Sequence, residues 1–246
     1  MAGAAATKPV PDAGSAVLSV QNLQAWYGES HILHGMDFNV NAGEVVTLLG
    51  RNGAGKTTTL KSVMGIIGKR TGSVRFNNQD TIRASSDKIA RMGMAFCPEE
   101  RGIFASLDVR ENLMLPPTVR SGGLSLDQIF ELFPNLKERL GSQGTKLSGG
   151  EQQMLAIGRI LRTGARFLML DEPTEGLAPV IIQQIGQTIK RLKSEGFTIL
   201  LVEQNFRFAA TVADRYYIVE HGKIIDGFAN AELQANMDKL HTYLGV

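Results

Sequence analysis

The 246-residue sequence predicts an α/β fold whose core is a mostly parallel sheet. Short β-type runs separated by turn residues fill the first part of the chain and predict an N-terminal antiparallel β subdomain. Apolar strands alternate with an amphipathic helix near the end, which is typical of a parallel sheet. Helical patterns dominate from about residue 85 to residue 161 and predict a helical subdomain inserted in the core.

The Ala-, Pro- and Gly-containing residues 1–16 predict a flexible tail, so the first regular element is expected to begin at Val17. Residues 17–246 are then one domain. The early strands are predicted at 17–20, 32–40, 44–49 and 73–76, and a helix follows Gly55. Two helices are predicted within the insertion, at 108–115 and 126–133. The later elements are a strand at 167–170, a helix from Pro179 to Gly196, a strand at 198–202, a hairpin around His221-Gly222 and a helix from about Ala231.

Composition excludes several classes of protein. The hydrophobic content of 43% suits a globular domain, and 26 Lys and Arg against 24 Asp and Glu leave a net charge of +2, too small to make nucleic acid the main partner. Cys97 is the only cysteine, so neither an internal disulfide nor a multi-thiolate zinc site is possible. No apolar run approaches the roughly 18 residues of a membrane span, and the start is unlike a signal peptide. We therefore expect a cytosolic chain.

The segment 50-GRNGAGKT-57 has the pattern of a phosphate-binding loop between a strand and a helix. Its glycines let successive backbone N–H groups point at a phosphate, and the helix N-terminus adds partial positive charge. Lys56 would supply a full charge to the β and γ phosphates, and the Thr57 hydroxyl would bind Mg²⁺. The alternative is a glycine-rich turn with an exposed lysine. The candidate nucleotide-binding residues here are Gly50, Asn52, Gly53, Ala54, Gly55, Lys56, Thr57 and Thr58.

Two adjacent acids end the apolar run 167-FLMLDE-172. A strand of this kind delivers a carboxylate to the sheet edge beside the phosphate-binding loop. We assign Asp171 to Mg²⁺ through its coordination shell and Glu172 to the general base that activates the attacking water. The alternative, a strand that ends in a solvated acidic turn, is less favoured beside such a loop.

A second anion site is predicted at 147-LSGGEQQ-153. Ser148 and Glu151 have the spacing of a capping box, and Gly149 and Gly150 would expose the first amides of the helix. A single nucleotide cleft does not obviously use both anion sites. An ordinary capped helix is the alternative.

The phosphate-binding loop, LSGGEQQ and LMLDEP, in that order, resemble the nucleotide-binding domain of ABC transporters, from Val17 to near the end. The resemblance implies an ABC ATPase form of the P-loop NTPase fold, with ATP and Mg²⁺ as ligands. In that family two domains pack head to tail, so Ser148, Gly149 and Gly150 would close over ATP held by a second molecule. Tyr27 matches the aromatic that stacks on adenine, with a buried tyrosine at a strand end as the alternative.

Two positions depart from the family pattern. Glu99, in 98-PEERGIF-104, replaces the usual glutamine, so whether it contacts Mg²⁺, water or a partner stays open. Gln204, in 202-VEQN-205, replaces the usual switch histidine. An amide can donate to a γ-phosphate but cannot hold a proton as imidazole does, so the role of base falls on Glu172, with Lys56 and Gln204 as supporting catalytic residues.

PEERGIF, LSGGEQQMLAIGRIL, DEPTEGLAP and VEQN together resemble one of the two ATPase subunits of branched-chain amino acid importers, a group that also includes urea and amide importers. The resemblance implies a second ATPase subunit, two membrane permease subunits and, indirectly, a periplasmic binding protein. It places the chain at the cytoplasmic face of a bacterial inner membrane. A heterodimer is implied, although a homodimer stays possible. Arg101, Ile103 and Phe104 are candidate permease contacts.

Other classes fit less well. Soluble ABC ATPases of DNA repair or ribosome function need coiled-coil insertions or tandem cassettes, and 246 residues hold neither. A GTP switch protein would need an N-K-x-D motif, which does not occur. A regulatory subunit that binds nucleotide without turnover stays open.

Overall fold

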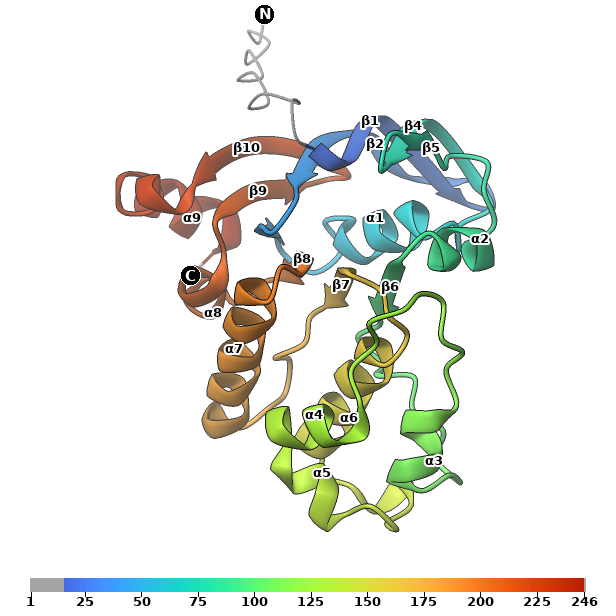
Figure 1. Ribbon diagram of the computed structural model, residues 1–246. Helices are drawn as coiled ribbons and strands as arrows, with labels where there is room; N and C mark the ends of the chain where they lie inside the picture. Colours follow the sequence, from blue (N-terminus) through green and yellow to red (C-terminus); the bar gives the residue numbers. More distant parts are fainter. Residues whose placement is uncertain (1–15, 246) are drawn as a thin grey trace, which may run out of the picture.

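The computed structural model describes residues 16–245 (Figure 1). The tail predicted for residues 1–16 therefore lies outside the described residues except for Ala16, which begins the first strand. None of the helices within residues 16–245 combines the length and the apolar character that a bilayer crossing requires.

Two sheets form the upper part of the molecule in Figure 1. The smaller has four strands in the order β2-β1-β4-β5, and the pairs β1–β2, β1–β4 and β4–β5 are antiparallel, as predicted for the N-terminal subdomain. These strands are β1 (Ala16–Tyr27), β2 (Ser30–Asn41), β4 (Lys69–Phe76) and β5 (Gln79–Asp80).

The larger sheet has six strands in the order β10-β9-β3-β8-β7-β6. All neighbouring pairs are parallel except β9–β10, so the predicted α/β fold with a mostly parallel core is confirmed. Strands β3, β7 and β8 are buried along their whole length, which explains their continuous apolar runs. The strands are β3 (Val45–Leu49), β6 (Met94–Cys97), β7 (Phe167–Asp171), β8 (Thr198–Glu203), β9 (Arg215–Glu220) and β10 (Lys223–Ala229).

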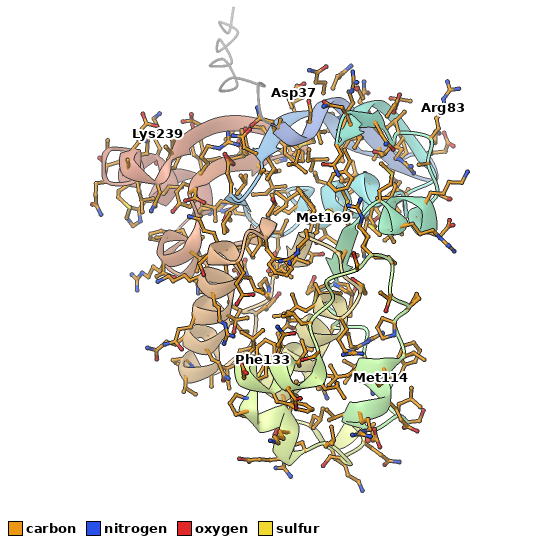
Figure 2. All side chains as sticks on the ribbon, in the orientation of Figure 1. Asp37, Arg83, Met114, Phe133, Met169 and Lys239 are labelled. Carbon is orange, nitrogen blue, oxygen red and sulfur yellow. The ribbon has the colours of Figure 1, made fainter. Side chains whose placement is uncertain are left out.

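Helices cover the larger sheet and form a lobe below it (Figure 1). Those attached to the core are α1 (Lys56–Val63), α2 (Ser86–Arg91), α7 (Pro179–Ser194), α8 (Phe206–Val212) and α9 (Met237–Leu244). Met169 of β7 is fully buried, and Figure 2 shows it near the middle of the molecule. It belongs to the same buried cluster as Leu60 and Val63 of α1. Pro179 opens α7 and Gly196 follows its end with a φ of +84°, as the sequence predicts.

The lower lobe contains the predicted helical insertion. Its helices are α3 (Val109–Met114), α4 (Leu126–Leu132), α5 (Pro134–Glu138) and α6 (Gly149–Leu161). Capping boxes at Asp108 and Ser125 begin α3 and α4. The predicted range of about 85–161 differs from the structure at its start, because Met94–Cys97 forms β6 beside β7 in the core sheet. The lobe proper therefore begins after Cys97.

The C-terminal end also differs from the prediction. The final helix was expected from about Ala231 but begins at Met237, because two short 3₁₀ turns, Asn230–Glu232 and Gln234–Asn236, precede it. Leu240 and Leu244 of α9 are buried in the same apolar cluster as Leu49 of β3. The cluster joins the C-terminal helix to the region around the end of this central strand.

Candidate functional site

The predicted phosphate-binding loop runs from the end of β3 to the start of α1. Gly53 and Gly55 adopt φ values of +80° and +105°, which glycine tolerates without strain. A side chain at Gly50 would collide with the carbonyl oxygen of Val219, so neighbouring β9 requires glycine there. Gly55 caps α1 without any side-chain hydrogen bond, which leaves the helix N-terminus to a ligand.

The turn between β9 and β10 supports this loop from outside. The Gly222 amide donates to the Ala54 carbonyl at 2.8 Å, and the Gly222 carbonyl accepts from the His34 amide at 2.8 Å. The hairpin predicted at His221-Gly222 therefore joins the antiparallel subdomain to the phosphate-binding loop.

Lys56 directs a buried ammonium into the centre of the site. Its Nζ donates to the carbonyl oxygens of Gly50 at 2.8 Å and Arg51 at 3.1 Å, and lies 3.0 Å from Glu172 Oε1. Both charged side chains are almost fully buried, so each depends on the other as a partner. The contact ties the phosphate-binding loop to the end of β7.

Asp171 and Thr57 form a second link between the same two segments. The Thr57 hydroxyl donates to Asp171 Oδ1 at 3.0 Å. Burial raises the pKa of Asp171 to about 6; the nearby carboxylates of Glu172 and Glu99 act in the same direction, and the Thr57 hydrogen bond opposes them. Asp171 Oδ2 and Glu172 Oε2 are buried without a hydrogen-bond partner. These two carboxylate oxygens could therefore bind a cation or accept a hydrogen bond from a ligand.

Glu172 has a strained backbone. Its φ of +43° lies in the left-handed region, which a glutamate rarely adopts, and its amide donates to the Val202 carbonyl of β8 at 3.0 Å. Strain of this kind persists only where the surroundings hold it, and it clusters at functional sites. Glu172 contacts Lys56, whereas Asp171, its neighbour at the end of β7, contacts Thr57.

The donor set fits a magnesium ion bound together with phosphates. Within residues 16–245, no group of three or more His, Cys, Asp or Glu side chains could hold a metal by itself. Mg²⁺ in nucleotide sites commonly takes one or two protein ligands and completes its shell with phosphates and water. The Thr57 hydroxyl and the unpartnered Asp171 Oδ2 match that need. Glu99 is exposed after β6, and its assignment to the ion stays a prediction.

The loop carrying Ser148 forms the predicted cap. Ser148 Oγ accepts from the Glu151 amide at 3.3 Å, and Glu151 Oε2 accepts from the Ser148 amide at 2.7 Å. Gly150 lies so close to Ile181 that an added Cβ would be 2.9 Å from it, whereas Ser148 is exposed. Figure 1 places α6 in the lower lobe and α1 in the upper part, so the two predicted anion sites belong to different parts of the chain.

Tyr27 and Gln204 both lie at strand ends and reach solvent. Tyr27 is 48% exposed, which argues against a buried structural tyrosine, and next to it Trp26 stacks on His31 with ring centroids 4.3 Å apart. Gln204 follows β8 and, with Gly50 and Arg51, lines a cavity of about 340 Å³. The fold therefore brings Gln204 beside the phosphate-binding loop, while its catalytic role stays a prediction.

Sequence reasoning missed Glu203, the last residue of β8. Its carboxylate is buried, and burial raises its pKa to about 7 despite a hydrogen bond from Thr174. The signal was present, because 198-TILLVE-203 is an apolar strand ending in an acid, as is 167-FLMLD-171.

Comparisons with known proteins agree with this geometry. A family model described as ABC transporter matches residues 33–175. The high-affinity branched-chain amino acid transport ATP-binding protein BraG of Pseudomonas aeruginosa is 42% identical over 232 residues, covering 93% of this chain and 100% of BraG. The lipopolysaccharide export system ATP-binding protein LptB of Escherichia coli K12 is 34% identical over 236 residues, covering 94% of this chain and 98% of LptB. A nucleotide-free ATP-binding cassette from an ABC transporter has a similar fold, with a TM-score of 0.81 at 24% identity over 94% of this chain and 99% of that one.

The raised pKa of Asp171 predicts a Mg²⁺ requirement that depends on pH. A carboxyl group protonated below about pH 6 cannot bind the ion, so the apparent Mg²⁺ affinity should fall by up to about tenfold per pH unit below 6 and level off above 7. Mg²⁺ titrations of ATP hydrolysis at pH 5 to 8 measure this. Because ATP phosphates titrate in the same range, Asp171→Asn is the control. Identical pH profiles for wild type and this variant would contradict the assignment.

Proposed function

Because this chain belongs to the ABC transporter family, we propose that it is the ATP-binding and ATP-hydrolysing subunit of an importer for branched-chain amino acids. This membership confirms the resemblance to ABC transporter nucleotide-binding domains that the sequence motifs indicate. The catalytic proposal rests on two contacts between the phosphate-binding loop and the end of β7. Lys56 forms an ion pair with Glu172, and Thr57 donates a hydrogen bond to Asp171.

Each candidate site residue has a separate role in ATP binding or hydrolysis. Backbone amides of residues 50–57 and the Lys56 ammonium bind the phosphates of ATP. Thr57 and Asp171 would hold Mg²⁺, which would supply positive charge to stabilise the phosphates of ATP. Glu172 takes a proton from the attacking water. Gln204 donates an amide hydrogen to the γ-phosphate, and Tyr27 stacks on the adenine.

A second ATPase subunit completes the site in this proposal. The exposed Ser148 turn, with Gly149 and Gly150 at the start of α6, closes over ATP held by the other subunit. ATP then bridges two subunits, and hydrolysis releases them. The second subunit is a related chain or another copy of this one.

The proposed cargo rests on similarity. BraG, named as a branched-chain amino acid transport protein, is 42% identical, whereas LptB, named for lipopolysaccharide export, is 34% identical over a similar length. The higher identity favours amino acid import. An importer for urea or amides is the alternative, because selectivity belongs to the permease and the periplasmic binding protein rather than to this chain.

An exposed apolar surface on the lower lobe supports docking to a permease at the cytoplasmic face of the inner membrane. Phe104, in the loop after β6, is 48% exposed, and Met114 and Leu115 are similarly exposed at the end of α3. Figure 2 shows Met114 on the outside of the lobe. Arg159 lies 5.0 Å from the Phe104 ring centroid and donates to the Gly102 carbonyl, which holds this loop against α6. The same loop contains Glu99, so motion at the site would reach this surface.

Catalysis is tested by the rate of phosphate release from the assembled transporter. Glu172→Gln should lower the rate at least about hundredfold because the base is lost, and Lys56→Ala should abolish ATP binding because its charge is lost. A catalytically silent regulatory subunit would give a different result: Glu172→Gln would leave the turnover of the complex unchanged.

Docking is tested by purification from membranes. Phe104→Asp puts a charge on the proposed surface and should reduce the amount of permease that co-purifies by at least about tenfold, while ATP binding is retained. Ile66→Asp is the matched control, because Ile66 is 50% exposed but lies in the loop after α1. Equal recovery of permease with both variants would show that the surface is not the docking site.

A further inference from the structure

Glu203 connects the two loops that carry Glu172 and Gln204. Its side chain is buried, with only 2% of the residue exposed. Oε1 accepts a hydrogen bond from the Thr174 hydroxyl at 2.8 Å, and Oε2 accepts from the Asn205 amide at 3.4 Å. Thr174 is two residues beyond Glu172, and Asn205 directly follows Gln204. One carboxylate therefore contacts both loops.

The same residue lies beside the start of the phosphate-binding loop. In the parallel pairing of β3 and β8, Glu203 is opposite Leu49, the residue before Gly50. On the other side of β8, Asp171 of β7 is opposite Val202. Glu203 thus lies where the carboxyl ends of three neighbouring strands meet, and Figure 1 shows β7 and β8 ending below α1.

A purely structural role explains this side chain poorly. A buried carboxylate is unfavourable unless a positive group or several hydrogen bonds compensate for it. Its hydrogen-bond partners, the Thr174 hydroxyl and the backbone amides of Thr174 and Asn205, are all neutral, and the nearby Glu172 carboxylate raises the pKa of Glu203 further.

The hydrogen bond between Thr174 and Glu203 would help to maintain the strained backbone of Glu172. A φ of +43° persists only if the chain on both sides is held. Before the strained residue, β7 is fixed in the sheet, and the Glu172 amide is bonded to Val202. Beyond it, the Thr174 hydroxyl is anchored to Glu203. The Thr174–Glu203 hydrogen bond thus adds a side-chain restraint to a turn in which the Glu175 amide also donates to the Glu172 carbonyl at 3.2 Å.

We propose that Glu203 is a positioning residue for ATP hydrolysis, which acts by holding Thr174 and thereby the strained turn that carries Glu172. The inference rests on the proposed role of Glu172 as the base. Because Glu203 acts on the loop of the base rather than on the phosphate-binding loop, its contact affects the rate of the chemical step more than nucleotide affinity.

Steady-state kinetics of the assembled transporter test the proposal. Thr174→Val removes the hydroxyl but keeps the shape, and should lower kcat about tenfold with KM for ATP within about twofold. Thr174→Ser keeps a hydroxyl and should restore most of kcat. Glu203→Leu should lower kcat to a similar extent, whereas Glu203→Gln, which keeps an acceptor for Thr174, should retain at least about half. In the Thr174→Val background, Glu203→Leu should cause a smaller further loss than in wild type, because the hydrogen bond from the Thr174 hydroxyl is already broken.

The matched control is Thr188→Val. Thr188 is also buried and also donates its hydroxyl, at 3.0 Å to the Gln184 carbonyl, but lies in α7. Thermal denaturation of each variant checks folding, and if Glu203→Leu fails to fold, the Thr174 variants alone decide. A kcat for Thr174→Val equal to that of Thr188→Val, or multiplicative losses in the double variant, would overturn the proposal. Full turnover by Glu172→Gln would instead show that the proposed base is misassigned.

Discussion

The rest of the site depends on the buried contact between the Lys56 ammonium and the Glu172 carboxylate, whose atoms lie 3.0 Å apart. Removing either partner would leave an uncompensated charge in the interior. Lys56 also donates to two carbonyl oxygens of its own loop, and these hydrogen bonds do not involve Glu172. The parallel sheet makes this possible, because β3 and β7 flank β8 and end at the same edge.

With the proposed roles of Lys56 and Glu172, this arrangement would couple nucleotide binding to activation of the base. In the structure, Glu172 is the anionic partner of Lys56. Phosphates of ATP would compete for the same ammonium, because Lys56 is the full positive charge of the phosphate-binding loop. Once Lys56 turns to the phosphates, Glu172 is free to accept a proton from water. Glu203, through Thr174, would keep the carboxylate in place during that exchange.

Local sequence patterns predicted those parts of the site that lie next to strand ends. The strand-to-helix context of residues 50–57 and the acids after 167-FLML-170 are local signals, and a parallel sheet necessarily brings such ends together. The Thr174–Glu203 and Ala54–Gly222 contacts could not be predicted, because they depend on tertiary packing between distant segments. The sequences of β6 and α8 are too short to show a clear hydrophobic period, so these elements were not predicted. The two 3₁₀ turns before Met237 are also too short to be recognised, so the final helix was predicted to begin too early.

The most direct test of the central claim is the dissociation constant of Mg²⁺-free ATP for Glu172→Gln compared with wild type, measured calorimetrically on the purified chain. If Glu172 competes with phosphate for Lys56, its neutralisation removes both the competitor and a repulsive charge. A gain of about 1 kcal/mol would correspond to binding about fivefold tighter. Equal or weaker binding by the variant would contradict the account, because it would mean that the Lys56–Glu172 contact does not oppose nucleotide binding.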